Sequence, residues 1–429
     1  MKRSWAASVI LTVLIAPRGV LGAGDPDPIP TPPSSMPVVA STPTPQIFSF
    51  SAFGTLGVVH SSESRADFAS STLVPSGAGY TDSWNVAVDS LLGAQLTANI
   101  TPKLAAVVQV IAQQNYDNSY TPHVEWANIK YQFTPDFSIR IGRAVLPLFL
   151  YSDTENVRYT YPWVRPPVEV YSLVPTTAID GIDLNGRFHI GDVSSTFEGN
   201  FGQNNTSQPH NGGTAYARQG FGFSNTSEYK SLTLRISYQS THLTIASVDR
   251  FFDAFRGFGP PGIAIADKYD SDDKIVSTEL IGASYDPGHW FLIGEWGHNN
   301  AHSFLGEYTG WYLSGGLRIR QFAPYLVYAH ESASSNSDPG LPLTGLPPAA
   351  AGFAAGLNAG LNALLESVPD QRTISLGLRW DFVTNLDLKV QADHTRLGAD
   401  SFGTLINVQP SLRPGGTVNL FSATVDFVF

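Results

Sequence analysis

The segment 145–178 holds the residues whose types and spacing are most suggestive of chemistry. Charges of both signs occur in it beside aromatic side chains, and its prolines would stiffen the backbone. Carboxylates that face guanidinium groups across a narrow watery passage filter ions and polar solutes by size and sign. Arg140, Arg143 and Arg187 lie in flanking segments and could supply the opposing charge. The charged residues expected to form such a constriction are Asp153, Glu155, Arg158, Arg165 and Glu169.

Two other interpretations of this segment remain open. The segment could pack on an outer rim, away from any passage. Alternatively its aromatic residues, between Tyr151 and Tyr171, could form a surface on which sugar rings stack.

Other kinds of chemistry find little support. The chain has no Cys, which excludes thiol catalysis and zinc–thiolate sites. It also lacks the spacing of a zinc protease, a P-loop or a serine-hydrolase elbow. Asp270, Asp272 and Asp273 could hold Ca²⁺, but their spacing favours a solvated acidic loop. We therefore expect no enzyme, cofactor or metal, and the net charge of −11 argues against a nucleic-acid partner.

Alternating strands are the elements that must position these charges. In residues 84–100, apolar side chains such as Leu92 and Leu96 share one face, and polar ones such as Asp89 and Gln95 share the other. Charged residues make up only 14% of the chain, well below the roughly 25% of soluble domains. Sixteen such segments can be placed after residue 46. They predict an all-β transmembrane antiparallel barrel of about sixteen strands.

The connections between the predicted strands alternate between short and long. Turns at 101–103, 134–136 and 383–386 are short, and loops such as 145–178 and 332–370 are long. Short turns at one rim and long loops at the other are typical of outer-membrane barrels. In the middle of the chain this pattern predicts a loop at 205–227, strands at 228–239 and 242–252, and a short turn at 239–242.

The alternation also predicts which charged residues face the lumen. A sixteen-stranded lumen is wide enough to hold water, so these charges need not be neutralised in pairs. The predicted pore-lining residues are Asp89, Arg140, Asp183, Arg187, Arg235, Glu295, Arg318, Arg379 and Lys389.

The two ends of the chain carry export signals. Lys2 and Arg3 precede an apolar core and small residues up to Ala23, which is typical of a signal peptide over 1–23. A Pro-rich stretch at 24–46 predicts a periplasmic linker, so the barrel would occupy 47–429. The last strand alternates and ends on Phe429, which we interpret as an assembly signal. Within the long loop 332–370, leucines at helical spacing predict a short helix over 352–368.

With these features in place, the chain resembles the Gram-negative general porins, which are trimeric sixteen-stranded diffusion channels. The resemblance lies in Leu96–Val110 (LTANITPKLAAVVQV), Ala127–Arg143 (ANIKYQFTPDFSIRIGR) and the closing strand Ser422–Phe429. It covers roughly 47–429. The chain departs from the family in its Pro-rich linker and in the segment 145–178, which lacks the family's acidic motif.

This resemblance implies a location in the outer membrane of a Gram-negative bacterium and a homotrimer. The implied partners are outer-membrane lipid, lipopolysaccharide, the barrel assembly machinery and small hydrophilic solutes. We therefore expect a porin for passive diffusion of solutes and ions. A channel selective for a sugar, phosphate or carboxylate remains open, as does a plugged structural or adhesive barrel.

Overall fold

The computed structural model describes residues 47–210, 212–333 and 337–429. The predicted signal peptide (1–23) and linker (24–46) lie outside the described residues.

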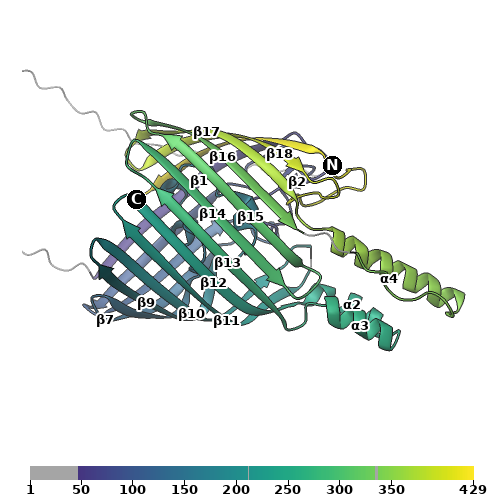
Figure 1. The fold of residues 1–429 in the computed structure, drawn as a ribbon. Helices are drawn as coiled ribbons and strands as arrows, with labels where there is room; N and C mark the ends of the chain where they lie inside the picture. Colours follow the sequence, from purple (N-terminus) through teal and green to yellow (C-terminus); the bar gives the residue numbers. More distant parts are fainter. Residues whose placement is uncertain (1–46, 211, 334–336) are drawn as a thin grey trace, which may run out of the picture. The chain divides into compact units, whose positions relative to one another are not determined.

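Sixteen long strands form one closed antiparallel barrel, as the sequence predicts (Figure 1). Each strand pairs with its neighbours in the chain, and β1 also pairs with β19 to close the wall. The end of the chain completes the closure, because Ala52 and Phe429 exchange two backbone hydrogen bonds of 2.9 and 2.7 Å. The barrel strands are β1 (Phe48–Ser61), β5 (Leu91–Thr101), β6 (Leu104–Gln113), β7 (His123–Thr134), β8 (Phe137–Val145), β9 (Ala178–Ile190), β10 (Val193–Ser207), β11 (Thr214–Tyr229), β12 (Leu232–Ile245), β13 (Lys274–Tyr285), β14 (Trp290–Ala301), β15 (Gly306–Leu317), β16 (Phe322–Ala333), β17 (Gln371–Val383), β18 (Leu386–Leu397) and β19 (Thr417–Val428).

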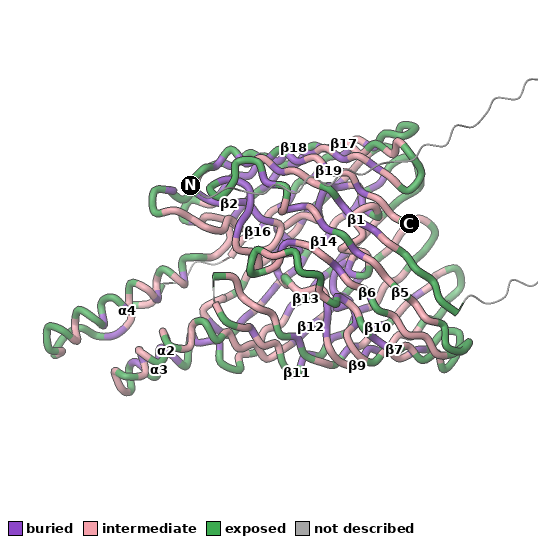
Figure 2. The backbone as a smooth tube through the Cα atoms, turned by 180° about the vertical axis from the view of Figure 1, so that it is seen from behind, coloured by how far each residue is buried: buried purple, intermediate pink, exposed green. Residues whose placement is uncertain are grey.

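Burial alternates along the strands of this wall (Figure 2), because successive side chains of a strand point to opposite faces. Large apolar residues such as Leu96, Ile141 and Leu376 point outward and are exposed, whereas polar residues such as Gln109 and Ser375 are buried on the lumen face. A continuous apolar outer surface of this kind is compatible with lipid rather than water. Closing the sheet also leaves no unpaired strand edge in an apolar environment.

The predicted short turns at 101–103, 134–136 and 383–386 are present, but the middle of the chain differs from the prediction. The structure has β11 and β12 joined at Lys230 and Ser231, where Lys230 adopts a positive φ of 54°. The predicted loop 205–227 is therefore wrong, because most of it is strand. The predicted turn 239–242 is also wrong, because these residues pair along the middle of β12. The strands expected at 228–239 and 242–252 are shifted accordingly.

The predicted strand 84–100 is shorter than expected. Only β5 belongs to the long wall, while Trp84 and Asn85 form the brief strand β4 against β1. Between them the chain turns at 86–90, so Asp89 lies in a turn rather than within a strand. Two more short strands, β2 (Asp67–Phe68) and β3 (Ala78–Gly79), pair within the same long connection.

The long loops at the other rim contain helices (Figure 1). The predicted helix at 352–368 is present as α4 (Pro348–Glu366), and the loop after β12 forms α2 (Asp249–Arg256) and α3 (Pro260–Tyr269). Their apolar residues share one small core outside the barrel, including Phe252, Phe255 and Leu361. None of the helices in the described ranges has the length and apolar character needed to cross a membrane.

The position of the turn between β11 and β12 can be tested with single cysteines, because the native chain contains none. We expect Lys230→Cys to react readily with a membrane-impermeant maleimide in the folded protein, since this residue is exposed. Ser240→Cys should react only after unfolding, because Ser240 is 6% exposed within the wall. If Ser240→Cys reacted in the folded protein and Lys230→Cys did not, the result would support a turn at 239–242 instead.

Candidate functional site

The connection between β8 and β9, residues 146–177, enters the barrel and is called the lumen loop here. It contains two 3₁₀ turns, η1 (Ser152–Thr154) and η2 (Arg158–Thr160), and one helical turn, α1 (Val168–Tyr171). Its hydrogen bonds reach strands on the far wall: Trp163 Nε1 donates to Ser314 Oγ at 2.8 Å, and Ser237 Oγ donates to the Leu148 carbonyl at 2.6 Å. The lumen loop therefore crosses the barrel instead of packing on its outer rim.

An apolar core inside the barrel fixes one side of the lumen loop. Loop residues such as Phe149, Trp163 and Val170 pack against lumen-facing apolar residues of β13 to β16. Trp163 is 1% exposed and meets the ring of Tyr312 edge-on at a centroid distance of 5.4 Å. Burying each large side chain of this kind stabilises the packed loop by roughly 1.5–3 kcal/mol. The members of this core from β13 to β16 are Leu280, Phe291, Ile293, Tyr312, Tyr325, Val327 and Ala329.

Two glycines in this wall let the loop backbone approach closely. A Cβ added at Gly310 in β15 would lie 1.9 Å from the Glu169 carbonyl oxygen. A Cβ at Gly282 in β13 would lie 2.6 Å from the Leu150 side chain. The strand carries glycine at these positions because the lumen loop occupies the space of a side chain.

A buried ion cluster fixes the other side of the lumen loop. Arg165 forms two hydrogen bonds to the fully buried carboxylate of Asp89, at 2.5 and 2.9 Å, and Arg158 donates to the same carboxylate at 2.8 Å. Arg165 also reaches Asp393 in β18 at 3.4 Å and Ser422 in β19 at 2.6 Å. Paired geometry of this type is strong when both partners are desolvated. This cluster ties two points of the lumen loop to three parts of the wall.

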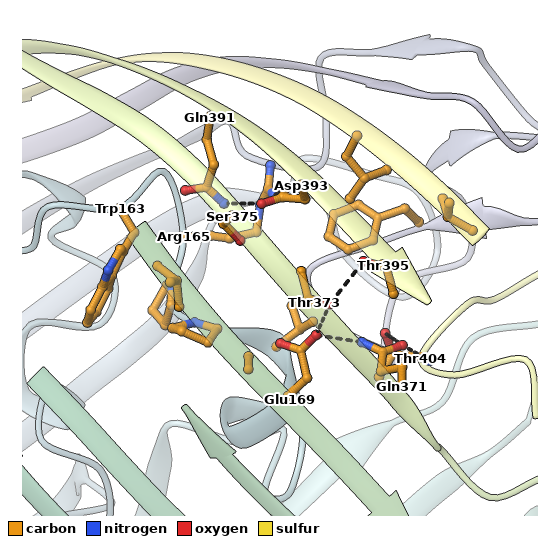
Figure 3. Close-up of a pocket in the computed structure, with 18 of the residues that line it drawn as sticks. Trp163, Arg165, Glu169, Gln371, Thr373, Ser375, Gln391, Asp393, Thr395 and Thr404 are labelled. Carbon is orange, nitrogen blue, oxygen red and sulfur yellow. Dashed lines mark hydrogen bonds and ion pairs between the residues drawn. The ribbon is translucent and has the colours of Figure 1, made fainter. Parts of the chain in front are cut away.

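Other wall residues hold the loop through individual contacts. Glu295 in β14 accepts hydrogen bonds from Tyr171, Tyr312 and the Leu150 amide. The carboxylate of Glu169 accepts hydrogen bonds from Gln371, at 2.9 Å, and from Thr373 (Figure 3).

Two cations of the wall bind the loop backbone near η2. Lys389 Nζ donates to the Arg158 carbonyl at 2.6 Å and pairs with Asp426 at 2.9 Å. Arg379 donates to the carbonyls of Tyr159 and Tyr161, at 2.7 and 3.1 Å. The loop is thus bonded along most of its length.

The opposite wall, from β7 to β12, carries charges of both signs that the loop leaves partly open. Arg140 pairs with Asp183 at 2.6 Å and approaches Glu198 at 3.6 Å, and Arg235 reaches Glu198 at 3.3 Å. Asp153 of the lumen loop is exposed and faces this group. Enclosure by the surrounding barrel wall and the charge of Glu198 raise the pKa of Asp153, whereas Arg140 and Arg235 lower it.

A second group of charges surrounds a cavity of about 430 Å³. Arg143 and Glu155 line it, and Arg143 pairs with Asp180 at 3.3 Å while both side chains keep contact with water. Enclosure within the lumen and the like charges of Glu125 and Glu295 raise the pKa of Glu155 to about 8, against the opposing effect of Arg158.

The predicted site residues therefore fall into three groups. Asp89, Glu295, Arg379 and Lys389 do not line an open passage but anchor the lumen loop, together with Arg158, Arg165 and Glu169. Arg140, Asp183, Arg235, Asp153 and Glu155 lie at or beside the part of the lumen that the loop leaves free. Arg187 is exposed near a short turn, and Arg318 lies beyond the end of β15 at the short-turn rim, paired with Asp286.

Sequence reasoning missed Glu198, which pairs with Arg140 and Arg235, and Asp426, which pairs with the anchoring residue Lys389. Both lie at lumen-facing positions of strands that were placed correctly. The alternation of polar and apolar residues along these strands could therefore have identified them. Of the aromatic residues in the loop, Tyr161, Trp163 and Tyr171 are buried in its core and are therefore not available to stack on a sugar ring. In the acidic loop, Asp270 is paired with Arg256 and Lys274, and the described residues hold no cluster suited to a metal.

Comparisons with known proteins show which solved structures this barrel is similar to. No family model matches the chain, and no curated protein matches it in sequence. Its structure is similar to that of OmpF from Salmonella typhi in complex with daunomycin, with a TM-score of 0.54 and 13% identity over 89% of this chain and 97% of that one. It is also similar to the outer-membrane channel DcaP of Acinetobacter baumannii, with a TM-score of 0.54 and 10% identity over 90% and 99% of the two chains.

A third similar structure is the anion-selective porin from Comamonas acidovorans, with a TM-score of 0.51 and 12% identity over 89% of this chain and all of that one. At these identities the likeness concerns the fold. The chain has the sixteen-stranded closed barrel of the Gram-negative porins.

The seating of the lumen loop can be tested at Gly310. Gly310→Ala places a methyl group against the loop backbone, so the loop must move, at a cost of about 1–3 kcal/mol. We expect limited proteolysis to cut the lumen loop faster in this variant. Gly186→Ala in β9 is the matched control, because its added Cβ meets nothing closer than 3.9 Å. Equal cleavage of both variants would contradict the close packing.

Proposed function

We propose that the chain is an outer-membrane channel through which small hydrophilic solutes and ions diffuse passively. The apolar outer surface places the barrel in lipid, and the porin fold is that of outer-membrane channels. The transport needs no catalytic step and no cofactor.

The observation that carries this proposal is the unequal lumen. The lumen loop fills most of the half that faces β13 to β19 with apolar packing and buried ion pairs. The half that faces β7 to β12 retains partly exposed charges, including Arg140 at 21% and Arg143 at 33% of their side-chain area. Water and ions would pass on this side, with Asp153 and Glu155 opposite the arginines. Of the five residues predicted to form the constriction, Asp153 and Glu155 are the two that lie on this side.

A plugged barrel is the second candidate, and the extent of loop packing favours it. The lumen loop is bonded to the far wall at many points, so it is not a flexible gate. Conductance decides between the two functions, because a plugged barrel carries no current.

The predicted partners remain part of the proposal. Homotrimer formation rests on the family resemblance, as do contacts with lipopolysaccharide and the assembly machinery. Phe429 is 70% exposed at the short-turn rim, where its side chain is accessible to an assembly factor before closure.

Asp153 tests the charge filter. We expect the folded wild-type protein to conduct in a planar bilayer under a KCl gradient, with a nonzero reversal potential. Asp153→Asn should move this potential toward anion preference, because a carboxylate that faces the passage is removed. Asp286→Asn at the short-turn rim serves as control. A folded wild-type protein without current would establish the plugged barrel instead.

Glu155 predicts a pH dependence. Its carboxyl is neutral below about pH 8 and negative above it, so cation preference should rise as the pH passes from 7 to 9. In the folded protein this carboxyl keeps its proton at pH values between its ordinary pKa of 4.5 and about 8. Its contribution to the free energy of unfolding therefore falls as the pH rises through this window. Glu155→Gln should remove the step in reversal potential. If the variant showed the same step, a group other than Glu155 would be responsible for the pH dependence.

A further inference from the structure

A second large cavity lies at the long-loop end of the barrel, between the wall and the last part of the lumen loop. Its volume is about 470 Å³, within the roughly 300–1,000 Å³ typical of ligand pockets. Strand residues from β10 to β16 line it on one side, and the segments 172–176, 364–369 and 403–405 line it on the others. Apolar side chains dominate the lining, among them Val174, Leu243, Phe304, Leu364 and Leu405.

Among the described residues that line the cavity, Glu331 of β16 is the only charged one. Glu331 is only 2% exposed, and its Oε1 accepts a hydrogen bond of 3.4 Å from the Ser172 hydroxyl. Within the described ranges, its Oε2 has no hydrogen-bond partner and Glu331 forms no ion pair. A buried carboxylate without a counter-charge is costly, so this position is incomplete as it stands.

The side-chain amide of the neighbouring Asn299 also has an acceptor without a hydrogen-bond partner in the described part of the chain. Asn299 of β14 donates from Nδ2 to the Leu173 carbonyl at 3.0 Å and to Thr278 Oγ1 at 3.2 Å, which fixes the orientation of its amide. Its Oδ1 is buried and has no hydrogen-bond partner among the residues that the structure describes. Among the described side chains that line the cavity, the unpartnered buried atoms are thus both acceptors. An occupant that satisfies them must donate hydrogen bonds.

We propose that this cavity binds amphiphilic amines, with the ammonium group at Glu331 and the apolar body against the lining side chains. An ammonium supplies three donors and the missing positive charge, and a carboxylate–ammonium hydrogen bond is strong in such surroundings. The proposal rests on the proposed channel function, because it gives the channel a solute class that it concentrates at its outer entrance.

Binding can be measured without transport. Isothermal titration of the folded, detergent-solubilised full-length protein would use phenethylammonium as probe, with 2-phenylethanol and phenylacetate as neutral and anionic analogues of the same apolar body. We expect the ammonium compound to bind at least tenfold more tightly than the alcohol, and phenylacetate not to bind.

Two variants locate the site. Glu331→Gln should weaken phenethylammonium binding at least tenfold while leaving 2-phenylethanol nearly unchanged. The exposed Glu307→Gln on β15 is the matched control and should bind as wild type does. If Glu331→Gln does not fold, Ala217→Phe fills the cavity from β11 without altering charge and should weaken both compounds.

Each outcome decides the proposal. Absence of binding by folded wild-type protein would overturn it, as would equal binding of the amine and the alcohol. Unchanged amine binding in folded Glu331→Gln or Ala217→Phe would place any binding elsewhere and overturn it too. KCl conductance is recorded separately, so a conducting protein that ignores amines refutes the amine site alone.

Discussion

The buried carboxylate of Asp89 is the interaction on which the rest of the lumen depends. It lies in the turn between β4 and β5, yet it receives Arg158 and Arg165 from a loop far along the chain. Arg165 then extends the contact to Asp393 and Ser422. Removing one partner from a buried pair costs about 3–5 kcal/mol, because the other charge is left without compensation. The cluster therefore fixes where the lumen loop lies, and the loop fixes the shape of the lumen.

The wall is built unequally to receive this loop. Strands β13 to β16 turn apolar side chains and glycines toward the lumen, which a water-filled pore would not need. Strands β17 to β19 supply charges that are fully buried, such as Lys389 and Asp426. Strands β7 to β12 keep charged groups such as Arg140 and Arg143 partly exposed in the lumen. A single barrel thus combines a protein-like core on one side with a polar passage on the other.

Much of the fold could be predicted from alternation, because each strand must show an apolar face to lipid. The prediction failed at β11, where Gly220, Gly222 and Asn225 give a strand the composition of a loop. It failed again at Lys230 and Ser231, a tight turn that contains neither Gly nor Pro. The polar run around Ser240 then looked like the turn. The predicted number of strands is still correct, because the two predicted strands at 228–239 and 242–252 are shifted along the chain and not lost.

The site was less accessible to sequence reasoning. Alternation identified lumen-facing charges such as Glu295 and Lys389, but it could not show that a loop covers them. That distinction depends on contacts across the barrel, such as Asp89 with Arg165, which lie 76 residues apart. Alternation also treats Leu280 or Tyr325 as irregularities, although these inward apolar residues are the wall of the loop's core.

Replacing residues 150–170 of the lumen loop by a short Gly-Ser linker would test the central claim most directly. Without the loop, water would fill the closed half of the lumen and solvate the exposed wall charges. Single-channel conductance in KCl should then rise several-fold over the wild-type value in protein shown to be folded. A conductance equal to that of the wild type would contradict the account, because the loop could not then occupy the lumen.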